Sequence, residues 1–113
     1  MPEFIGNRSP FADPDARGLI AGLGRENELD SLVTLYLARM CGLGYGTRQM
    51  VRSLHEKGGP IDTIIVSGGA GQSELALQPL ADATGQVVAT TTSPEPVLLG
   101  SAMLGAVAPA PLS

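Results

Sequence analysis

The chain has 113 residues, of which 43% are hydrophobic and 16% are charged, so it is long enough for one globular domain with a modest core. All basic residues precede Gly58, and the half that follows carries only the charges of Asp62, Glu74, Asp82 and Glu95. Nucleic-acid binding requires a basic surface that displaces counterions from phosphate. This distribution excludes a nucleic-acid partner. An anion held by the second half must rely on backbone N–H groups, a metal ion or groups outside this chain.

The sequence indicates a cytoplasmic protein with no membrane partner. The uncharged stretch 96–113 is interrupted by glycine and proline, and its composition predicts a core helix instead of a membrane span. The N-terminus has no basic region followed by an apolar run, so no signal peptide is predicted. The single cysteine, Cys41, excludes an internal disulfide and is expected to be a small buried helix residue.

Residues 1–26 are expected to form an irregular loop, because glycine and proline punctuate short apolar pairs. Within this loop, Arg8 or Arg17 is a candidate to form an ion pair with Asp13 or Asp15. A connection of this length in a compact domain is usually functional or packs against another surface.

A long amphipathic helix is predicted from about Glu28 to Glu56, where apolar side chains recur at spacings of three and four. Asn27 or Asp30 is expected to cap its start, and the sequence 58–60 (Gly-Gly-Pro) ends it. Its middle contains three glycines, Gly42, Gly44 and Gly46. Each disfavours a helix by about 1 kcal/mol relative to alanine. Their clustering indicates either close approach by another backbone or ligand, or a kink.

A strand and a second helix are predicted next. The apolar run Ile61–Val66 is expected to be a strand buried on both faces, as in a parallel sheet. Ser73 is expected to cap a helix that runs to about Thr84 and is ended by Gly85. Pro79 lies inside this helix, where it removes one backbone hydrogen bond and should cause a kink.

The second strand is predicted at Gln86–Thr90, followed by a helix over Glu95–Ala108 and a frayed tail at 109–113. The fold class is therefore α/β, in the order loop-α-β-α-β-α, with 27–108 as its core and a small parallel sheet. A two-stranded sheet leaves edges unpaired, since three or more strands are normally needed for stability. The chain is therefore expected to be part of a larger fold and to form a homo-oligomer.

The strongest local motif is the glycine-rich turn Ser67–Gly71 between the first strand and the helix that begins at Ser73. Glycine lets a ligand approach the backbone, and the helix start offers free N–H groups. The turn is not a phosphate-binding Walker loop, since no Lys-Ser/Thr follows, and it is not the dinucleotide Gly-x-Gly-x-x-Gly pattern. The spacing alone leaves two readings open, a nucleotide contact or a simple strand-to-helix turn.

No catalytic or metal-binding set of residues is found in the sequence. His55 has no cysteine or histidine near it and is expected to be a surface residue at the helix end. No Ser-His-Asp set and no nucleophile elbow can be assembled. Catalytic residues and a metal site are therefore not predicted in this chain.

Several motifs in a fixed order resemble one known family. They include Asn7–Pro10, Asp13–Gly18, Tyr45–Arg48 and Ser67–Gly69, followed by Glu95 and the Leu-Gly pairs of the last helix. Together they resemble the C-terminal part of FGGY-family carbohydrate kinases, and the Gly-Asn-Arg-Ser-Pro form resembles the ribulokinase-like branch, which phosphorylates pentuloses. The resemblance covers essentially residues 2–108, and so describes 1–113 as a C-terminal fragment.

The resemblance implies part of a ribonuclease-H-like, actin-like ATPase fold and a kinase that uses ATP and Mg²⁺. In that family the glycine turn and the following helix start hold the nucleoside side of ATP, and the matching positions are Gly68, Gly69, Ala70 and Ser73. The family's catalytic aspartate, its phosphate-binding loops and most of its sugar site lie upstream and have no counterpart here. A sugar substrate would bind only together with that upstream part.

The chain departs from the family pattern at Gly71-Gln72 and at Glu74, where relatives often carry a basic residue and a proline, and at Pro79. The resemblance predicts an ATP-dependent sugar kinase in which this chain supplies the nucleoside-binding wall and is inactive alone. The alternative is a non-catalytic, self-associating or partner-binding remnant whose glycine turn is purely structural. Another acceptor, such as glycerol or xylulose, is also left open.

Overall fold

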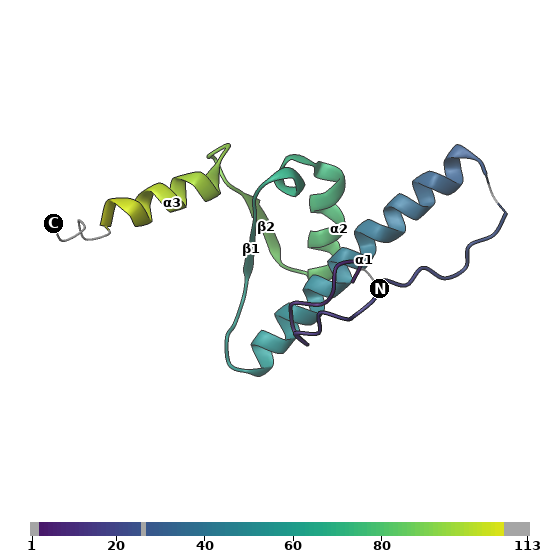
Figure 1. Cartoon of the computed structure of the whole chain (residues 1–113), viewed down its shortest axis with the longest axis horizontal. Helices are drawn as coiled ribbons and strands as arrows, with labels where there is room; N and C mark the ends of the chain where they lie inside the picture. The colour runs from purple at the N-terminus through teal and green to yellow at the C-terminus, as the bar shows by residue number, and fades with distance from the viewer. Residues whose placement is uncertain (1–2, 26, 108–113) are drawn as a thin grey trace.

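A computed structural model describes residues 3–25 and 27–107, and it contains three α-helices, a short 3₁₀-helix and two strands in those ranges (Figure 1). The elements in chain order are α1 (Leu29–Glu56), β1 (Thr63–Val66), η1 (Gly69–Gln72), α2 (Glu74–Thr84), β2 (Val87–Thr90) and α3 (Pro96–Val107). This order confirms the predicted sequence of elements. Strand β1 is two residues shorter than expected, and β2 is one residue shorter. The predicted tail at 109–113 lies outside the described residues.

Helix α1 is continuous through all three of its glycines, so the expected long helix is confirmed and its glycine cluster does not interrupt it. The expected caps are wrong: Glu28 occupies the N-cap position, and its side chain makes no capping hydrogen bond. Within the helix, the hydroxyls of Thr34 and Thr47 each donate a hydrogen bond to the carbonyl four residues earlier. Cys41 is half-buried in this helix and not fully buried.

The best-buried part of the structure is the crossing of α1 and α2. Its buried residues are Gly44, Val51, Ala83 and Thr84. A Cβ on Gly44 would lie 2.8 Å from the Cβ of Ala83 and 3.0 Å from the carbonyl oxygen of Pro79. Real Cβ atoms do not approach other carbon atoms so closely, so glycine at position 44 lets the two helices meet. Close approach by another backbone, one of the two predictions for the glycine cluster, is confirmed at Gly44.

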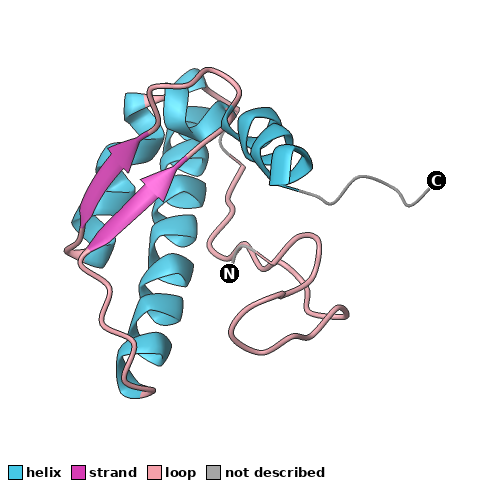
Figure 2. Ribbon diagram, turned by 90° about the vertical axis from the view of Figure 1, so that its left-hand side faces the viewer, coloured by secondary structure: helices cyan, strands magenta, loops and turns pink. Residues whose placement is uncertain are grey.

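The two strands form a parallel sheet in which Thr63 pairs with Val87 and Ile65 pairs with Ala89. Side chains alternate between the two faces of a strand, so this register places Ile65 and Val87 on the same face. Both are largely exposed, at 69% and 65%, whereas Ile64 on the opposite face is half-buried. The prediction that β1 is buried on both faces is therefore wrong. Helices α1 and α2 lie on one side of the sheet (Figure 2), and α2 packs against β2.

Helix α2 starts and stops close to the predicted residues. Gly85 ends it in the left-handed conformation, with φ of 68°, and donates its N–H to the carbonyl of Ala81. The helix is a single element through Pro79. Ser73 holds the N-cap position as predicted, but its side chain makes no capping hydrogen bond, so that part of the prediction is wrong.

The described part of the N-terminal region, 3–25, is irregular as expected, with only isolated bridges. Its turns are closed by Asn7, which donates its N–H to the carbonyl of Asp13, and by the Asp13 carboxylate, which accepts the N–H of Asp15. The expected ion pairs of Arg8 or Arg17 with these aspartates do not form among the described residues. The Asp13 carboxylate is occupied by backbone instead. Phe4 fastens the loop to α1, where its ring lies 5.9 Å from the guanidinium carbon of Arg39.

Helix α3 projects away from the other elements (Figure 1), and its apolar side chains are exposed. The chain exposes 9039 Å², whereas a compact protein of 11.6 kDa exposes about 5,800 Å². Its radius of gyration is 18.0 Å, against about 13 Å for a compact domain of this length. In the described residues, no helix is long and apolar enough to cross a membrane. Exposed apolar surface on this scale favours burial against another protein surface.

We predict that the isolated chain self-associates at micromolar concentration, because both sheet edges and the Ile65/Val87 face are uncovered. Replacing Ile65 and Val87 together by lysine should shift the population toward the monomer, since charged side chains on an exposed strand oppose edge pairing. Light scattering coupled to gel filtration measures both masses. Gln49→Lys together with Gln72→Lys, at two exposed polar positions, is the charge-matched control. A monomeric native chain across this range would contradict the prediction.

Candidate functional site

The site singled out by the sequence is a compact turn between the end of β1 and the start of α2, formed by Gly68–Ser73 and called the glycine turn below. It contains the 3₁₀-helix η1, which the sequence did not predict. Two backbone hydrogen bonds close the turn, from the N–H of Gly71 to the carbonyl of Gly68 and from the N–H of Ser73 to the carbonyl of Ala70. The structure therefore brings Gly68, Gly69, Ala70 and Ser73 together as predicted.

Gly68 has a backbone conformation that only glycine adopts readily, with φ of 73° and ψ of −158°. Its neighbour Gly69 does not have a positive φ. No heavy atom lies within 4 Å of a Cβ built on Gly68 or Gly69. The outer side of the turn is therefore open, and a flat ligand can lie directly against its backbone.

Gly71 lies on the inner side of the turn, and its contacts are of a different kind. A Cβ at this position would lie 2.8 Å from the carbonyl oxygen of Val66, the last residue of β1. The half-buried Gly71 thus lets the turn fold back against the end of the strand. Although the sequence comparison with the family marked position 71 as a departure, the structure gives it a packing role.

The turn offers hydrogen-bond donors but no positive side chain. The first hydrogen bonds of α2 run from the N–H groups of Ala76 and Leu77 to the carbonyl of Ser73, so the preceding N–H groups of the first turn have no helical partner. Glu74 is exposed in that turn. Backbone donors at a helix start suit a ribose hydroxyl or a ring nitrogen. A triphosphate would meet the exposed Glu74 carboxylate, and neither the turn nor α2 carries a lysine or arginine to offset its charge.

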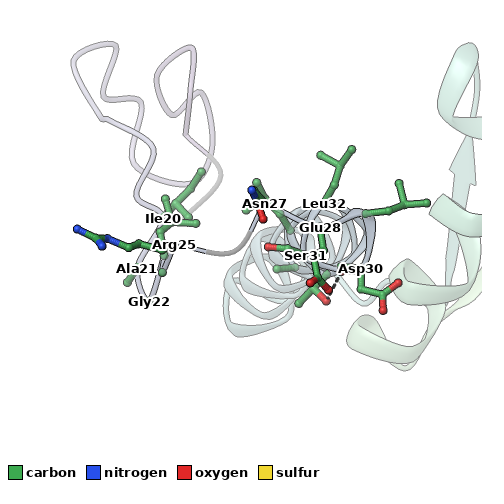
Figure 3. Close-up of a pocket in the computed structure, with 15 residues that line it drawn as sticks. Ile20, Ala21, Gly22, Arg25, Asn27, Glu28, Asp30, Ser31 and Leu32 are labelled. Carbon is green, nitrogen blue, oxygen red and sulfur yellow. Dashed lines mark hydrogen bonds between the residues drawn. The ribbon is translucent and has the colours of Figure 1, made fainter.

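A second candidate is a hollow of ≈ 1290 Å³ at the far end of α1, between residues 20–25 and the first turns of the helix. Arg25 is the only basic residue among the described residues that line it, and Figure 3 shows that its side chain points away from α1. Glu28 and Asp30 add negative charge at the same place. This hollow is therefore unsuited to a phosphate, and its lining residues include none of the glycine turn.

His55, which the sequence analysis considered as a metal ligand, has a structural contact instead. His55 is exposed at the end of α1, as predicted, and its Nε2 accepts the N–H of Ile61 at 2.8 Å. That bond joins the end of α1 to the approach to β1. In the ranges 3–25 and 27–107, no group of three or more histidine, cysteine, aspartate or glutamate residues is placed to hold a metal ion.

Comparison with known proteins identifies the family. The profile of the "FGGY family of carbohydrate kinases, C-terminal domain" matches residues 1–109. The chain belongs to this FGGY family. The C-terminal domain of the family has the actin-like ATPase fold, so the predicted fold class is confirmed together with the resemblance.

The proteins that are similar in sequence to this chain include kinases named for different substrates. An FGGY carbohydrate kinase domain-containing protein of Danio rerio is 42% identical over 95% of this chain and 20% of its own length. A D-ribulokinase of Saccharomyces cerevisiae is 36% identical over 94% of this chain and 15% of its own length. A glycerol kinase of Alteromonas mediterranea is 33% identical over 92% of this chain and 20% of its own length. The chain thus spans about a fifth or less of the length of these relatives.

The contact that sequence reasoning missed joins Arg48 to α2. An Nη1 N–H of Arg48 donates to the carbonyl of Ala83 at 3.1 Å, across 35 residues of sequence. Arg48 belongs to the Tyr-Gly-Thr-Arg motif that carried part of the family resemblance, but no local pattern indicates its partner. Only the four-residue spacing from Gly44 to Arg48, which places both on one face of α1, pointed in this direction.

Proposed function

We propose that this chain is the nucleoside-binding part of an ATP-dependent sugar kinase, a cytoplasmic enzyme that transfers a phosphoryl group from MgATP to a hydroxyl of a pentulose or a related sugar or polyol. The adenosine of ATP lies against Gly68, Gly69 and Ala70, with Ser73 at the helix start near the base or ribose. The observation that carries the proposal is the open backbone of the glycine turn in a chain of the FGGY family.

The residues of the turn fit a nucleoside. The space beside Gly68 and Gly69 holds no heavy atom within 4 Å of a built Cβ, so a ring system can approach the backbone there. The Ser73 hydroxyl has no capping bond within its own helix and is free to bond a ligand. The unbonded N–H groups of the first turn of α2 supply further donors.

The phosphates and Mg²⁺ must be held elsewhere in the active protein. Phosphoryl transfer depends on neutralising the charge of the transferred group and on a base that orients the acceptor hydroxyl. The half of the chain that contains the glycine turn has no lysine or arginine, and Glu74 would repel a phosphate. In this proposal, residues beyond this chain supply the base, the phosphate contacts and the sugar site, and the chain is inactive alone.

A non-catalytic alternative is supported by a different observation, the uncovered apolar surface. The Ile65/Val87 face, both sheet edges and helix α3 are the features expected of a chain that binds another protein or a second copy of itself. In that case the glycine turn is only a strand-to-helix connection. A nucleotide titration separates the two functions, since the alternative requires no adenosine binding.

We predict that adenosine and ATP bind the native chain with similar, weak affinity, with a Kd of about 0.1–1 mM. The phosphates find no cation beside the turn, so they should add little. Gly69→Val should abolish this binding, because its side chain would fill the open space without forcing a positive φ. Chemical-shift titration by NMR measures the Kd values, and circular dichroism verifies folding.

The control for this substitution is Gly105→Val in α3, where a Cβ also meets nothing within 4 Å. It adds the same side chain far from the turn and should leave adenosine binding unchanged. Equal adenosine binding by a folded Gly69→Val variant would remove the turn as the site. ATP binding much tighter than adenosine would mean that phosphate contacts exist elsewhere in the chain.

We also predict that the purified chain shows no sugar-dependent ATP hydrolysis or transfer with pentuloses, pentitols or glycerol in excess MgATP. The physical reason is the lack of a phosphate-binding cation near the turn. A coupled assay for ADP release measures turnover, with a full-length FGGY kinase as the positive control. Turnover within tenfold of a typical enzyme rate of about 10 s⁻¹ would overturn the proposed division of labour.

A further inference from the structure

The crossing of α1 and α2 contains two residues of α1 that lie against the same residue of α2. Gly44, Arg48 and Val51 follow one another at spacings of four and three, so they lie on one face of α1. Both Gly44 and Arg48 lie against Ala83 of α2. A Cβ on Gly44 would collide with the Ala83 side chain, and Arg48 donates a hydrogen bond to the Ala83 carbonyl. No other place in the described chain combines buried residues from two helices in this way.

Gly44 sets the distance between the helices. With a Cβ, position 44 would come within 2.8 Å of the Ala83 Cβ and within 3.0 Å of the Pro79 carbonyl oxygen. Ala83 is only 7% exposed and Pro79 contributes backbone, so neither can move without moving α2. A methyl group at position 44 therefore has to push α2 away from α1.

Arg48 fixes α2 along its axis. The guanidinium donates to the carbonyl of Ala83, in the last turn of α2, at 3.1 Å. Carbonyls of the last helical turn lack helical partners and carry the negative end of the helix dipole, so a cation binds them favourably. One hydrogen bond from a side chain on α1 thus ties down the C-terminal end of α2.

The other end of α2 begins at the glycine turn. The helix has 11 residues, a length of about 16 Å, and is a single element through Pro79. The turn is also held against β1, because Gly71 packs on the carbonyl oxygen of Val66. A shift of α2 against α1 must therefore change the geometry between the end of β1 and the first turn of α2.

We propose that Gly44 and Arg48 are positioning residues for the nucleoside site, acting through Ala83 and helix α2 on Gly68–Ser73. The inference rests on the proposed function, since it names the residues that hold that site in shape. It assigns a role in ligand binding to a place about one helix length from the ligand. Neither residue touches the nucleoside.

The test compares Gly44→Ala, Ala83→Gly and the double variant in the native chain. Gly44→Ala should shift the backbone amide NMR signals of Gly68–Ser73 in the ligand-free protein and weaken adenosine binding about tenfold, which corresponds to about 1.4 kcal/mol. The double variant removes the methyl group that Gly44→Ala meets first, and so should recover most of both effects. Gly105→Ala, in open space on α3, is the matched control.

Arg48→Met provides a second route if Gly44→Ala does not fold. It keeps the length of the side chain and removes the donor to Ala83, so it should also shift the turn signals and weaken adenosine binding. Arg48→Lys should recover part of the loss. A purely structural role would lower the unfolding midpoint but leave the turn signals and the Kd of the folded protein unchanged. That result for both residues would overturn the inference.

The two proposals fail in different ways. If the native chain does not bind adenosine, the proposed function fails, while the ligand-free amide signals of Gly68–Ser73 still report on positioning. If the native chain binds adenosine but the turn signals ignore Gly44→Ala and Arg48→Met, the positioning inference fails and the nucleoside site stands.

Discussion

The structure depends on one close contact, the approach of α1 and α2 at Gly44 and Ala83. The most buried side chains, those of Val51, Ala83 and Thr84, lie on these two helices, at 6%, 7% and 9% exposure. Because position 44 has no Cβ, the helices meet at backbone distance and α2 can lie between α1 and the sheet. Without this contact the two-stranded sheet would have no helix layer to support it. Two strands alone are marginal in water.

The rest of the molecule is arranged around this small core and is only partly covered by it. Helix α2 protects one face of the sheet, and the other face, with Ile65 and Val87, is open. Helix α3 makes no comparable contact and exposes its apolar side chains. The glycine turn differs from these surfaces, because it exposes backbone N–H groups and its inner side packs on the end of β1 through Gly71. Firm support below and open space above are what a ligand-binding backbone requires.

Local patterns predicted the elements well, since each rests on residues close in sequence. The three- and four-residue spacing defined α1, and Gly85 ended α2 as expected. The errors concern contacts. The strand run Thr-Ile-Ile-Val is apolar at nearly every position, so its pattern does not reveal which face lacks a partner. The predicted capping hydrogen bonds at the starts of α1 and α2 are absent, because a side chain of the right type need not point toward the free N–H groups of the helix. The expected arginine pairs do not form, and the Asp13 carboxylate accepts the backbone N–H of Asp15 instead.

The position of the candidate site was predictable from the sequence, but its backbone conformation and the contacts that hold it were not. The run Ser-Gly-Gly-Ala-Gly between a strand and a helix identified the turn, and the family resemblance gave it a ligand. Neither indicated that Gly68 adopts the positive φ, that residues 69–72 form a 3₁₀-helix, or that Gly71 packs on Val66. These features belong to the backbone of the turn and to its contact with β1, which the residue pattern does not encode. The Arg48–Ala83 bond spans 35 residues and has no local signature.

Native-state hydrogen exchange tests most directly whether the crossing of α1 and α2 is the core on which the fold depends. Amides whose opening requires global unfolding exchange most slowly, and those that open locally exchange fast. We expect the slowest exchange in α1 from Gly44 to Val51 and in the last turns of α2, with fast exchange in α3 and in residues 3–25. Strongest protection in α3, with rapid exchange in the middle of α1, would contradict it.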